Sequence, residues 1–174
     1  QAGDRARHLT QQLLAFSKRQ VMEMRVLDLN TLFRELEPMF ERLIGEGIQL
    51  HIELAPDLRP VEADPTQIEQ IMMNLAANAR DAISGEGVLS IVTENMSLSG
   101  PESGAGRLSL KSGDYSVITV SDSGCGMTPD VLEHVFDPFF TTKPAEQGVG
   151  LGLATVYGIV KQHGGYIWPE STPG

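Results

Sequence analysis

Three polar side chains line one side of a helix predicted in the middle of the chain. Asn74, Asn78 and Asp81 follow one another at steps of four and three, which return to the same side of a helix turning roughly 100° per residue. Asn and Asp are modest helix formers, so their alignment indicates a polar site rather than helix propensity. Amide and carboxylate oxygens are the ligands that a hard cation such as Mg²⁺ accepts. A solvated helix face is the alternative interpretation.

A glycine-rich loop stands in front of the last predicted helix. Gly148, Gly150 and Gly152 leave the backbone N–H groups at the helix start free of side-chain bulk. Such N–H groups, together with the positive end of the helix dipole, can hold phosphate groups. The spacing is neither that of a P-loop nor that of a dinucleotide fingerprint. It therefore predicts a phosphate-binding loop of another kind.

An acidic turn lies between these two motifs in the sequence. Asp122 ends a predicted strand and is followed by Gly124 and Gly126, which allow the backbone to approach a ligand closely. Taken alone, this pattern is equally typical of a tight turn. Cys125 is the only cysteine, so an internal disulfide or a cysteine zinc site is excluded and a reducing compartment is expected.

Size and charge narrow the classes of function. The chain has 174 residues, enough for one domain and an appendage, and only 6% aromatic residues, so its core must be mostly aliphatic. A net charge of -10 argues against a nucleic-acid partner, because binding phosphate backbones needs clustered Lys and Arg. No apolar run approaches the roughly 20 residues that span a bilayer.

The first third of the chain is predicted to be mainly helical. Residues 1–24 are expected to form one helix. Its apolar seam repeats in steps of three and four, which is typical of packing on another helix; docking on its own domain is equally compatible. A second helix is expected at residues 31–44, with Asn30 as N-cap and Pro38 kinking or splitting it. Residues 48–54 alternate apolar and polar side chains, which predicts a half-buried strand.

The remaining elements position the three motifs. Asp64 and Pro65 begin a helix that should reach about residue 83, with its core face made by Ile68, Ile71, Leu75, Ala79 and Ala82. Strands are expected at residues 88–94 and 115–121, joined through a Ser/Gly-rich hairpin loop at residues 97–113. The long loop 124–150 contains one short helix started by Thr128. A helix at residues 151–163 and a strand beginning at residues 166–168 follow.

The order of these motifs resembles the nucleotide-binding domain of sensor histidine kinases, within the GHKL superfamily. The run Phe136–Lys143 is similar to the F box of the nitrogen-regulator and hybrid-kinase subset, and the resemblance covers nearly the whole chain. It implies an α/β fold, the two-layer Bergerat sandwich with a mixed, mainly antiparallel sheet, preceded by a long helix. Residues 1–24 would be the second helix of a dimerisation domain, residues 25–174 the ATP-binding catalytic domain, and residues 124–150 its lid. The last strand is expected to be truncated after residue 174.

The resemblance also implies roles for individual residues. Asn78 would hold Mg²⁺, and Asp122 would accept the adenine amino proton. Asn74 replaces the Glu that serves as base in hydrolytic relatives, which favours phosphoryl transfer over hydrolysis. Lys143 would reach a phosphate, while Phe139 and Phe140 would hold the lid on the core. The implied catalytic residues are Asn74, Asn78 and Lys143. The implied ATP-binding residues are Asn78, Asp81, Asp122, Gly124, Gly126, Met127, Phe140, Thr141, Thr142, Lys143, Gly148, Val149, Gly150, Leu151, Gly152 and Leu153.

The implied activity is transfer of the ATP γ-phosphate to a histidine, for relay to an aspartate of a response-regulator receiver domain. ATP and Mg²⁺ would be the cofactors, and the parent protein would be a homodimer through its dimerisation helices, with this part in the cytoplasm and without membrane contact. His8, His51, His134 and His163 do not fit the acceptor pattern, so this chain is expected to bind ATP without phosphorylating itself. A hydrolytic GHKL ATPase and a non-catalytic dimerisation or receiver-docking module are the alternatives.

Overall fold

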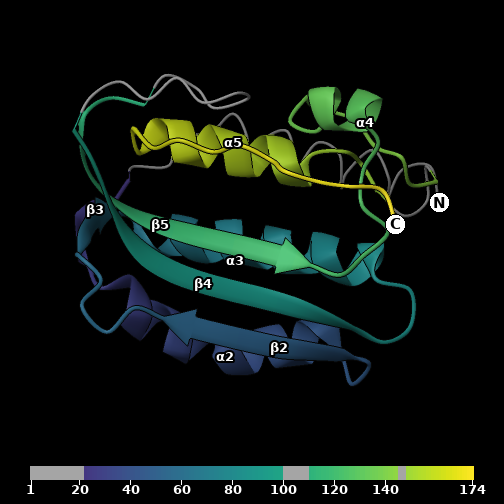
Figure 1. The fold of residues 1–174 in the computed structure, drawn as a ribbon, viewed down its shortest axis with the longest axis horizontal. Coiled ribbons are helices and arrows are strands. Elements are labelled where there is room, and N and C mark those ends of the chain that lie inside the picture. The colour runs from purple at the N-terminus through teal and green to yellow at the C-terminus, as the bar shows by residue number, and fades with distance from the viewer. Residues whose placement is uncertain (1–21, 100–109, 145–147) are drawn as a thin grey trace, which may run out of the picture.

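The fold is built on one mixed three-stranded sheet. The computed structural model describes residues 22–99, 110–144 and 148–174 (Figure 1). Strands β2 (Ile48–Leu54), β4 (Gly87–Leu98) and β5 (Gly113–Asp122) lie in the order β2-β4-β5. β2 is parallel to β4, whereas β4 and β5 are antiparallel. Residues 1–21 of the predicted first helix and most of the hairpin loop lie outside the described residues, and residues 22–24 are not helical.

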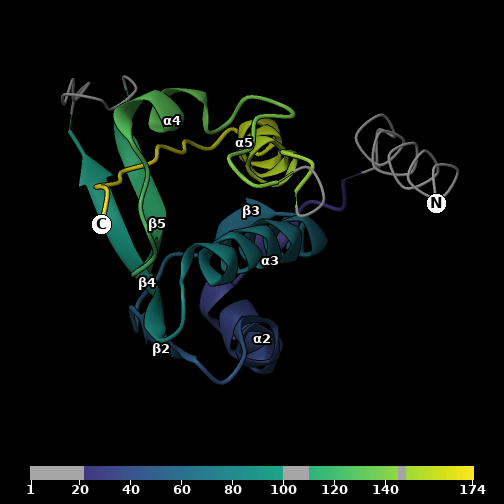
Figure 2. The same cartoon turned by 90° about the vertical axis from the view of Figure 1, so that its right-hand side faces the viewer.

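The helices gather on one face of this sheet, as Figure 2 shows. They are α2 (Leu29–Ile44), α3 (Pro65–Ala82) and α5 (Gly152–Gln162), and the short α4 (Pro129–His134) lies beside α5, on its β5 side in this view. The core between the two layers contains side chains that are almost completely buried, namely Phe33, Phe40, Met72, Leu89, Ile91 and Val156. The predicted two-layer α/β sandwich with a mixed sheet is therefore confirmed.

Helix α2 begins earlier than predicted and is not split. Asp28 is its N-cap, because its side chain accepts hydrogen bonds from the backbone N–H groups of Asn30 and Thr31. Asn30, the predicted cap, is buried, and its Nδ2 donates to the carbonyl oxygen of Ala55 at 2.6 Å. The helix also continues through Pro38, which lies on its exposed side, where water can satisfy the carbonyl left without a partner.

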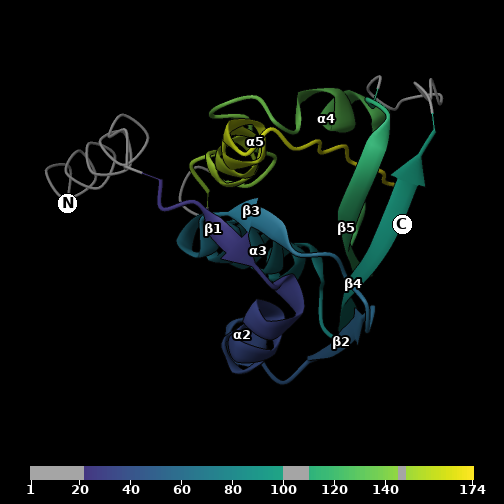
Figure 3. The same ribbon diagram turned by 90° about the vertical axis from the view of Figure 1, so that its left-hand side faces the viewer.

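Two predictions about strands were incomplete or wrong. The strands β1 (Arg25–Leu27) and β3 (Val61–Ala63) form a separate antiparallel pair (Figure 3) that three-residue segments are too short to signal in the sequence. The strand expected at residues 166–168 does not form. That segment lies against the sheet through side chains instead of a backbone ladder, with the Tyr166 ring 5.9 Å from that of Tyr115 in β5.

The start of α3 is tied to two other parts of the chain by Asp64. One carboxylate oxygen accepts from the N–H of Thr66 at 2.9 Å, as the predicted N-cap should, and the other accepts from the N–H of Glu23 at 3.0 Å. The Asp64 N–H in turn donates to Nε2 of His163, at the end of α5. Burial alone would raise the pKa of Asp64, but the hydrogen bonds from backbone N–H groups and the nearby His163 together lower it.

Replacing Asp64 with Ala is expected to lower the free energy of unfolding by about 1–2 kcal/mol, because the cap of α3 is lost. Since the pKa of Asp64 is lower in the folded chain, its charge stabilises the fold above the ordinary value of 3.8 and loses this effect as the pH falls through the folded value. Urea unfolding at pH 7 and at steps down to about pH 3 measures both effects. Asp64→Asn, which keeps an acceptor oxygen, should be less destabilised; an Ala variant as stable as the unmodified chain would contradict this role.

Candidate functional site

The predicted polar stripe lies along the side of α3 that faces α5. Asn74 and Asn78 are half-buried, and Asp81 is more exposed. The core face of α3 is rotated slightly from the predicted one, because this helix packs between α2 and α5 as well as on the sheet. Leu75 and Ala82 are only partly buried. The buried positions are Gln67, Ile68, Ile71, Met72, Ala76 and Ala79.

The first residue of α5 lies against this stripe. A Cβ atom placed on Gly152 would be 3.5 Å from Nδ2 of Asn78 and 3.7 Å from Oδ1 of Asn74. No side chain caps α5, since Leu151 at its N-cap has no polar group to offer. Nδ2 of Asn78 is buried and has no hydrogen-bond partner among the described residues. An uncapped helix start beside a buried free donor favours an anionic ligand at this point.

Lys143 reaches the same stripe from the segment between α4 and α5. Its Nζ lies 2.6 Å from Oδ2 of Asp81, while the guanidinium of Arg80 lies 2.6 Å from Oδ1. Burial would raise the pKa of Asp81, but hydrogen bonds from Lys143 and Arg80, and then their charges, lower it. The sequence did not point to Arg80, because it precedes Asp81 directly and so lies off the helical stripe.

The segment Phe136–Lys143 is joined to the glycine loop by a close backbone contact. The N–H of Phe139 donates to the carbonyl oxygen of Gly150 at 2.8 Å. Gly150 has a φ of +70°, and a Cβ there would lie 2.5 Å from the carbonyl carbon of Phe139, so only glycine fits without a shift. Phe139 is 55% exposed, so the expectation that it holds the lid on the core was wrong. Its φ of 68° turns the chain at this point, while Phe140 contacts the His134 ring at 5.7 Å.

The acidic turn lies on the C-terminal end of α3. Oδ1 of Asp122 accepts from the N–H of Gly124 at 2.9 Å, and the N–H of Cys125 donates to the carbonyl oxygen of Ala82. A Cβ on Gly124 would be only 2.7 Å from that of Ala82, so this glycine permits the close approach. Asp122 is thus linked to the Asn74–Asn78 stripe through the end of α3 rather than by direct contact.

The other predicted binding residues surround these contacts. Oγ1 of Thr141 accepts from the N–H of Lys143 at 3.1 Å, and a Cβ on Gly148 would lie 3.3 Å from that oxygen. The N–H of Met127 donates to the hydroxyl of Ser171, and Gly126 faces the carbonyl oxygen of Thr172. Leu151 and Leu153 are half-buried at the start of α5, whereas Thr142 and Val149 are exposed.

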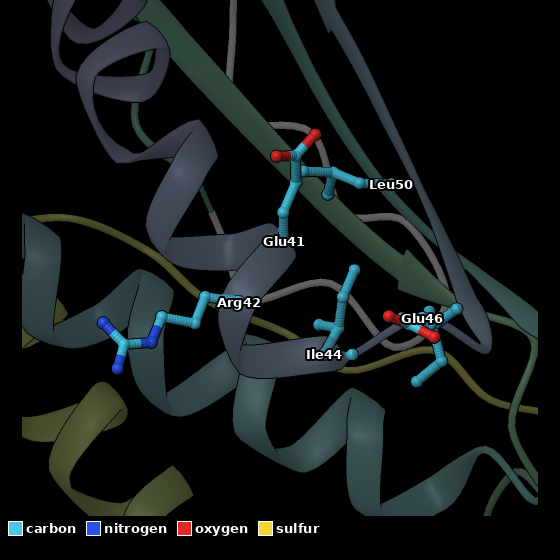
Figure 4. A pocket seen from close by; sticks show the side chains of 7 residues that line it. Glu41, Arg42, Ile44, Glu46 and Leu50 are labelled. Carbon is cyan, nitrogen blue, oxygen red and sulfur yellow. The ribbon is translucent and has the colours of Figure 1, made fainter.

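Two other features of the described residues offer less chemistry than this region. In the described part of the chain, no group of three or more His, Cys, Asp or Glu side chains is placed to hold a metal ion. A hollow of about 420 Å³ lies between the end of α2 and the start of β2 (Figure 4). It is lined by Glu41, Arg42, Ile44, Gly45, Glu46, Ile48 and Leu50, and by none of the predicted site residues. The polar side chains and the uncapped helix start that meet between α3 and α5 therefore make that region the candidate site.

The described helices include none with the length and apolarity needed to cross a bilayer.

Residues 63–174 match the family described as histidine kinase-, DNA gyrase B-, and HSP90-like ATPase. The chain is 46% identical over 177 residues to the sensor kinase CckA of Brucella abortus (strain 2308), covering 100% of this chain and 18% of that protein. It is 37% identical over 172 residues to the sensor histidine kinase ZraS of Escherichia coli (strain K12), covering 98% and 33%. The chain thus spans at most a third of these relatives.

Solved structures with a similar fold are also histidine kinases. The catalytic domain of histidine kinase ThkA, in a nucleotide-free form, has a TM-score of 0.62 and 34% identity, with 84% of this chain and 86% of that one covered. ThkA in complex with the response regulator protein TrrA has a TM-score of 0.69 and 28% identity, with 97% and 44% covered.

Proposed function

The chain belongs to the histidine kinase-, DNA gyrase B-, and HSP90-like ATPase family, and on this premise we propose that it is the ATP-binding catalytic domain of a sensor histidine kinase. The observation that supports this most is the convergence of Asn74 and Asn78 on the uncapped start of α5 at Gly152. The polyphosphate would lie at this helix start, held by backbone N–H groups of the glycine loop.

Asn78 fits the role of metal and phosphate ligand. Its buried Nδ2 has no partner in the described chain, so a phosphate oxygen would satisfy a donor that otherwise costs free energy. Its Oδ1 would be the protein ligand to Mg²⁺, a cation that commonly takes one or two protein oxygens and completes its shell with phosphates and water. When bound, Mg²⁺ would neutralise charge on the phosphates. The described residues offer no carboxylate cluster for a metal ion. A Mg²⁺ held jointly by Asn78 and the phosphates therefore suits this chain.

Asn74 favours transfer to another group over hydrolysis. An amide cannot take the proton of an attacking water, so the site lacks a base at this position beside Gly152. In the proposed reaction, a ring nitrogen of the acceptor histidine bonds to the γ-phosphorus as the bond to the β,γ-bridging oxygen breaks. ADP leaves with that electron pair, and the proton on the other ring nitrogen passes to solvent. Lys143 would contact the transferred phosphate.

The acceptor histidine would lie outside the described residues, and the environment of His163 supports this for that residue. Nδ1 of His163 lies 2.8 Å from the carbonyl oxygen of Ile159, and Nε2 accepts from Asp64, so both nitrogens are engaged. Nδ1 of His134 lies 2.8 Å from Asp137, whose hydrogen bond raises the pKa of His134.

The proposed partners follow from the same premise. The phosphoryl group would pass to an aspartate of a receiver domain, for which the similarity to ThkA bound to a response regulator protein is the support. The parent protein would be a homodimer through the dimerisation domain to which residues 1–24 would belong, with its catalytic domain in the cytoplasm.

Incubation with Mg²⁺ and γ-labelled ATP tests this function. We expect the chain to bind ATP, to release little free phosphate and to carry no acid-labile label. A separate fragment bearing an acceptor helix should then become labelled when it is added. Steady release of phosphate would support a hydrolase instead. Acid-labile label on this chain alone would show that one of its own histidines is the acceptor.

A further inference from the structure

We propose that Asp81 is a specificity-determining residue of this site: it holds Lys143 in competition with the γ-phosphate and so sets the preference between ATP and ADP. This rests on the proposed function. Nζ of Lys143 lies 2.6 Å from Oδ2 of Asp81, and the two side chains are 30% and 29% exposed. A short charge-assisted hydrogen bond between two partly exposed side chains lies at the upper end of the range for surface ion pairs.

Two cations share the carboxylate of Asp81, so Lys143 can leave it at a small cost in free energy. Arg80 holds Oδ1 through both Nε, at 2.9 Å, and a terminal nitrogen, at 2.6 Å. When Lys143 leaves Oδ2, Asp81 therefore keeps both hydrogen bonds from Arg80 to Oδ1 and is not left as an unpaired charge. The three side chains carry two positive charges and one negative charge, so a positive charge remains available to an anion.

Lys143 is already beside the loop that would hold the phosphates. A Cβ placed on Gly148 would lie 3.4 Å from Cδ of Lys143, so the lysine stem runs along the start of the glycine loop. Asp81 lies three positions after Asn78 on the same side of α3, next to the proposed metal and phosphate ligand. A terminal phosphate at this point, with more negative charge than one carboxylate, would attract Nζ away from Asp81.

This exchange predicts different effects on the two nucleotides. ATP must draw Lys143 from Asp81 before its γ-phosphate gains the ion pair, whereas ADP lacks that phosphate and leaves the Lys143–Asp81 pair intact. Asp81 therefore reduces the affinity for ATP and has little effect on the affinity for ADP. It acts through Lys143 and is not a ligand of the nucleotide, in contrast to the role that the family resemblance implied.

Calorimetric titration of Mg-ATP and Mg-ADP into four forms of the chain tests the proposal: unmodified, Asp81→Asn, Lys143→Gln and the double variant. Asp81→Asn should raise ATP affinity by roughly 5-fold, the size of one partly shielded ion pair, and leave ADP affinity unchanged. Lys143→Gln should reduce ATP affinity toward that of ADP. In the Lys143→Gln background, Asp81→Asn should have no further effect, because the two residues act as one pair.

Asp114→Asn is the matched control, since Asp114 pairs with Arg59 at 3.2 Å on β5 and should change neither affinity. Loss of ATP affinity in Asp81→Asn would overturn the proposal and make Asp81 a direct ligand. An equal gain from Asp81→Asn with and without the Lys143→Gln substitution would also overturn it, since a general charge effect needs no lysine. Failure of the unmodified chain to bind either nucleotide would instead refute the proposed function itself.

Discussion

Replacing Asn78 with Ala is expected to remove the Mg²⁺ dependence of ATP binding and to lower ATP affinity by roughly 10- to 100-fold, the equivalent of about 1.4–3 kcal/mol. The substitution deletes both the oxygen proposed to hold Mg²⁺ and the buried Nδ2 that lies beside Gly152. Binding of ADP without Mg²⁺ should change much less, because contacts to the base remain. Titrations of both nucleotides with and without Mg²⁺ measure the difference.

Asn95→Ala serves as the control for the loss of an amide. Asn95 lies in β4, where its Nδ2 donates to the carbonyl oxygen of Asp57 at 2.9 Å, away from α5. That variant should keep the full Mg²⁺ enhancement even if it is somewhat less stable. If Asn78→Ala kept the full enhancement as well, Asn78 would be a structural amide, and the metal would have to bind elsewhere.

The parts of the fold that could be predicted from the sequence are those with a local physical signal. Asp64 and Thr128 are polar caps followed directly by proline, and both begin helices where predicted. The strand at residues 48–54 shows a period of two in its side chains and forms with those bounds. Each of these signals lies within about seven residues and does not depend on the rest of the chain.

The predictions that failed depend on partners distant in sequence. Asn30 was expected to cap α2, but it is buried, accepts from Thr93 at 3.1 Å and donates to Ala55. Both partners follow it by more than twenty positions, so no local pattern shows them. On sequence grounds alone, Asp28 is as good a cap for α2 as Asn30. The strand β1 likewise forms by pairing with β3, which lies far along the chain.

The candidate site divides in the same way. The stripe of Asn74, Asn78 and Asp81 follows from helical spacing alone and does lie together on α3. Its contact with Gly152, and the pair between Asp81 and Lys143, bring together positions more than sixty residues apart. The sequence indicated which residues carry the chemistry, but the packing of α3 on α5 is needed to show that Lys143 already has a carboxylate partner.

Replacing Asp122 with Asn is expected to lower ATP affinity by roughly 5- to 150-fold, or about 1–3 kcal/mol, and to weaken the preference for adenine. Oδ1 of Asp122 is engaged by the N–H of Gly124 at 2.9 Å, which leaves the second carboxylate oxygen to accept from the adenine amino group. An Asn side chain can keep the bond to Gly124 with its own oxygen, so the turn should remain folded. Its NH₂ group then faces the adenine amino group, and two donors oppose each other.

The same geometry predicts a gain for guanine, because its carbonyl oxygen can accept from the new NH₂ group. The ratio of ATP to GTP affinity should therefore fall in Asp122→Asn, and titration of both nucleotides into both proteins measures it. Asp57→Asn, at an exposed position before β3, is the control and should leave the ratio unchanged. Equal binding of ATP and GTP by the unmodified chain would remove the assignment of Asp122 to the base. An Asp122→Asn variant that kept the original ratio of ATP to GTP affinity would also remove this assignment, since the new NH₂ group would then not contact the base.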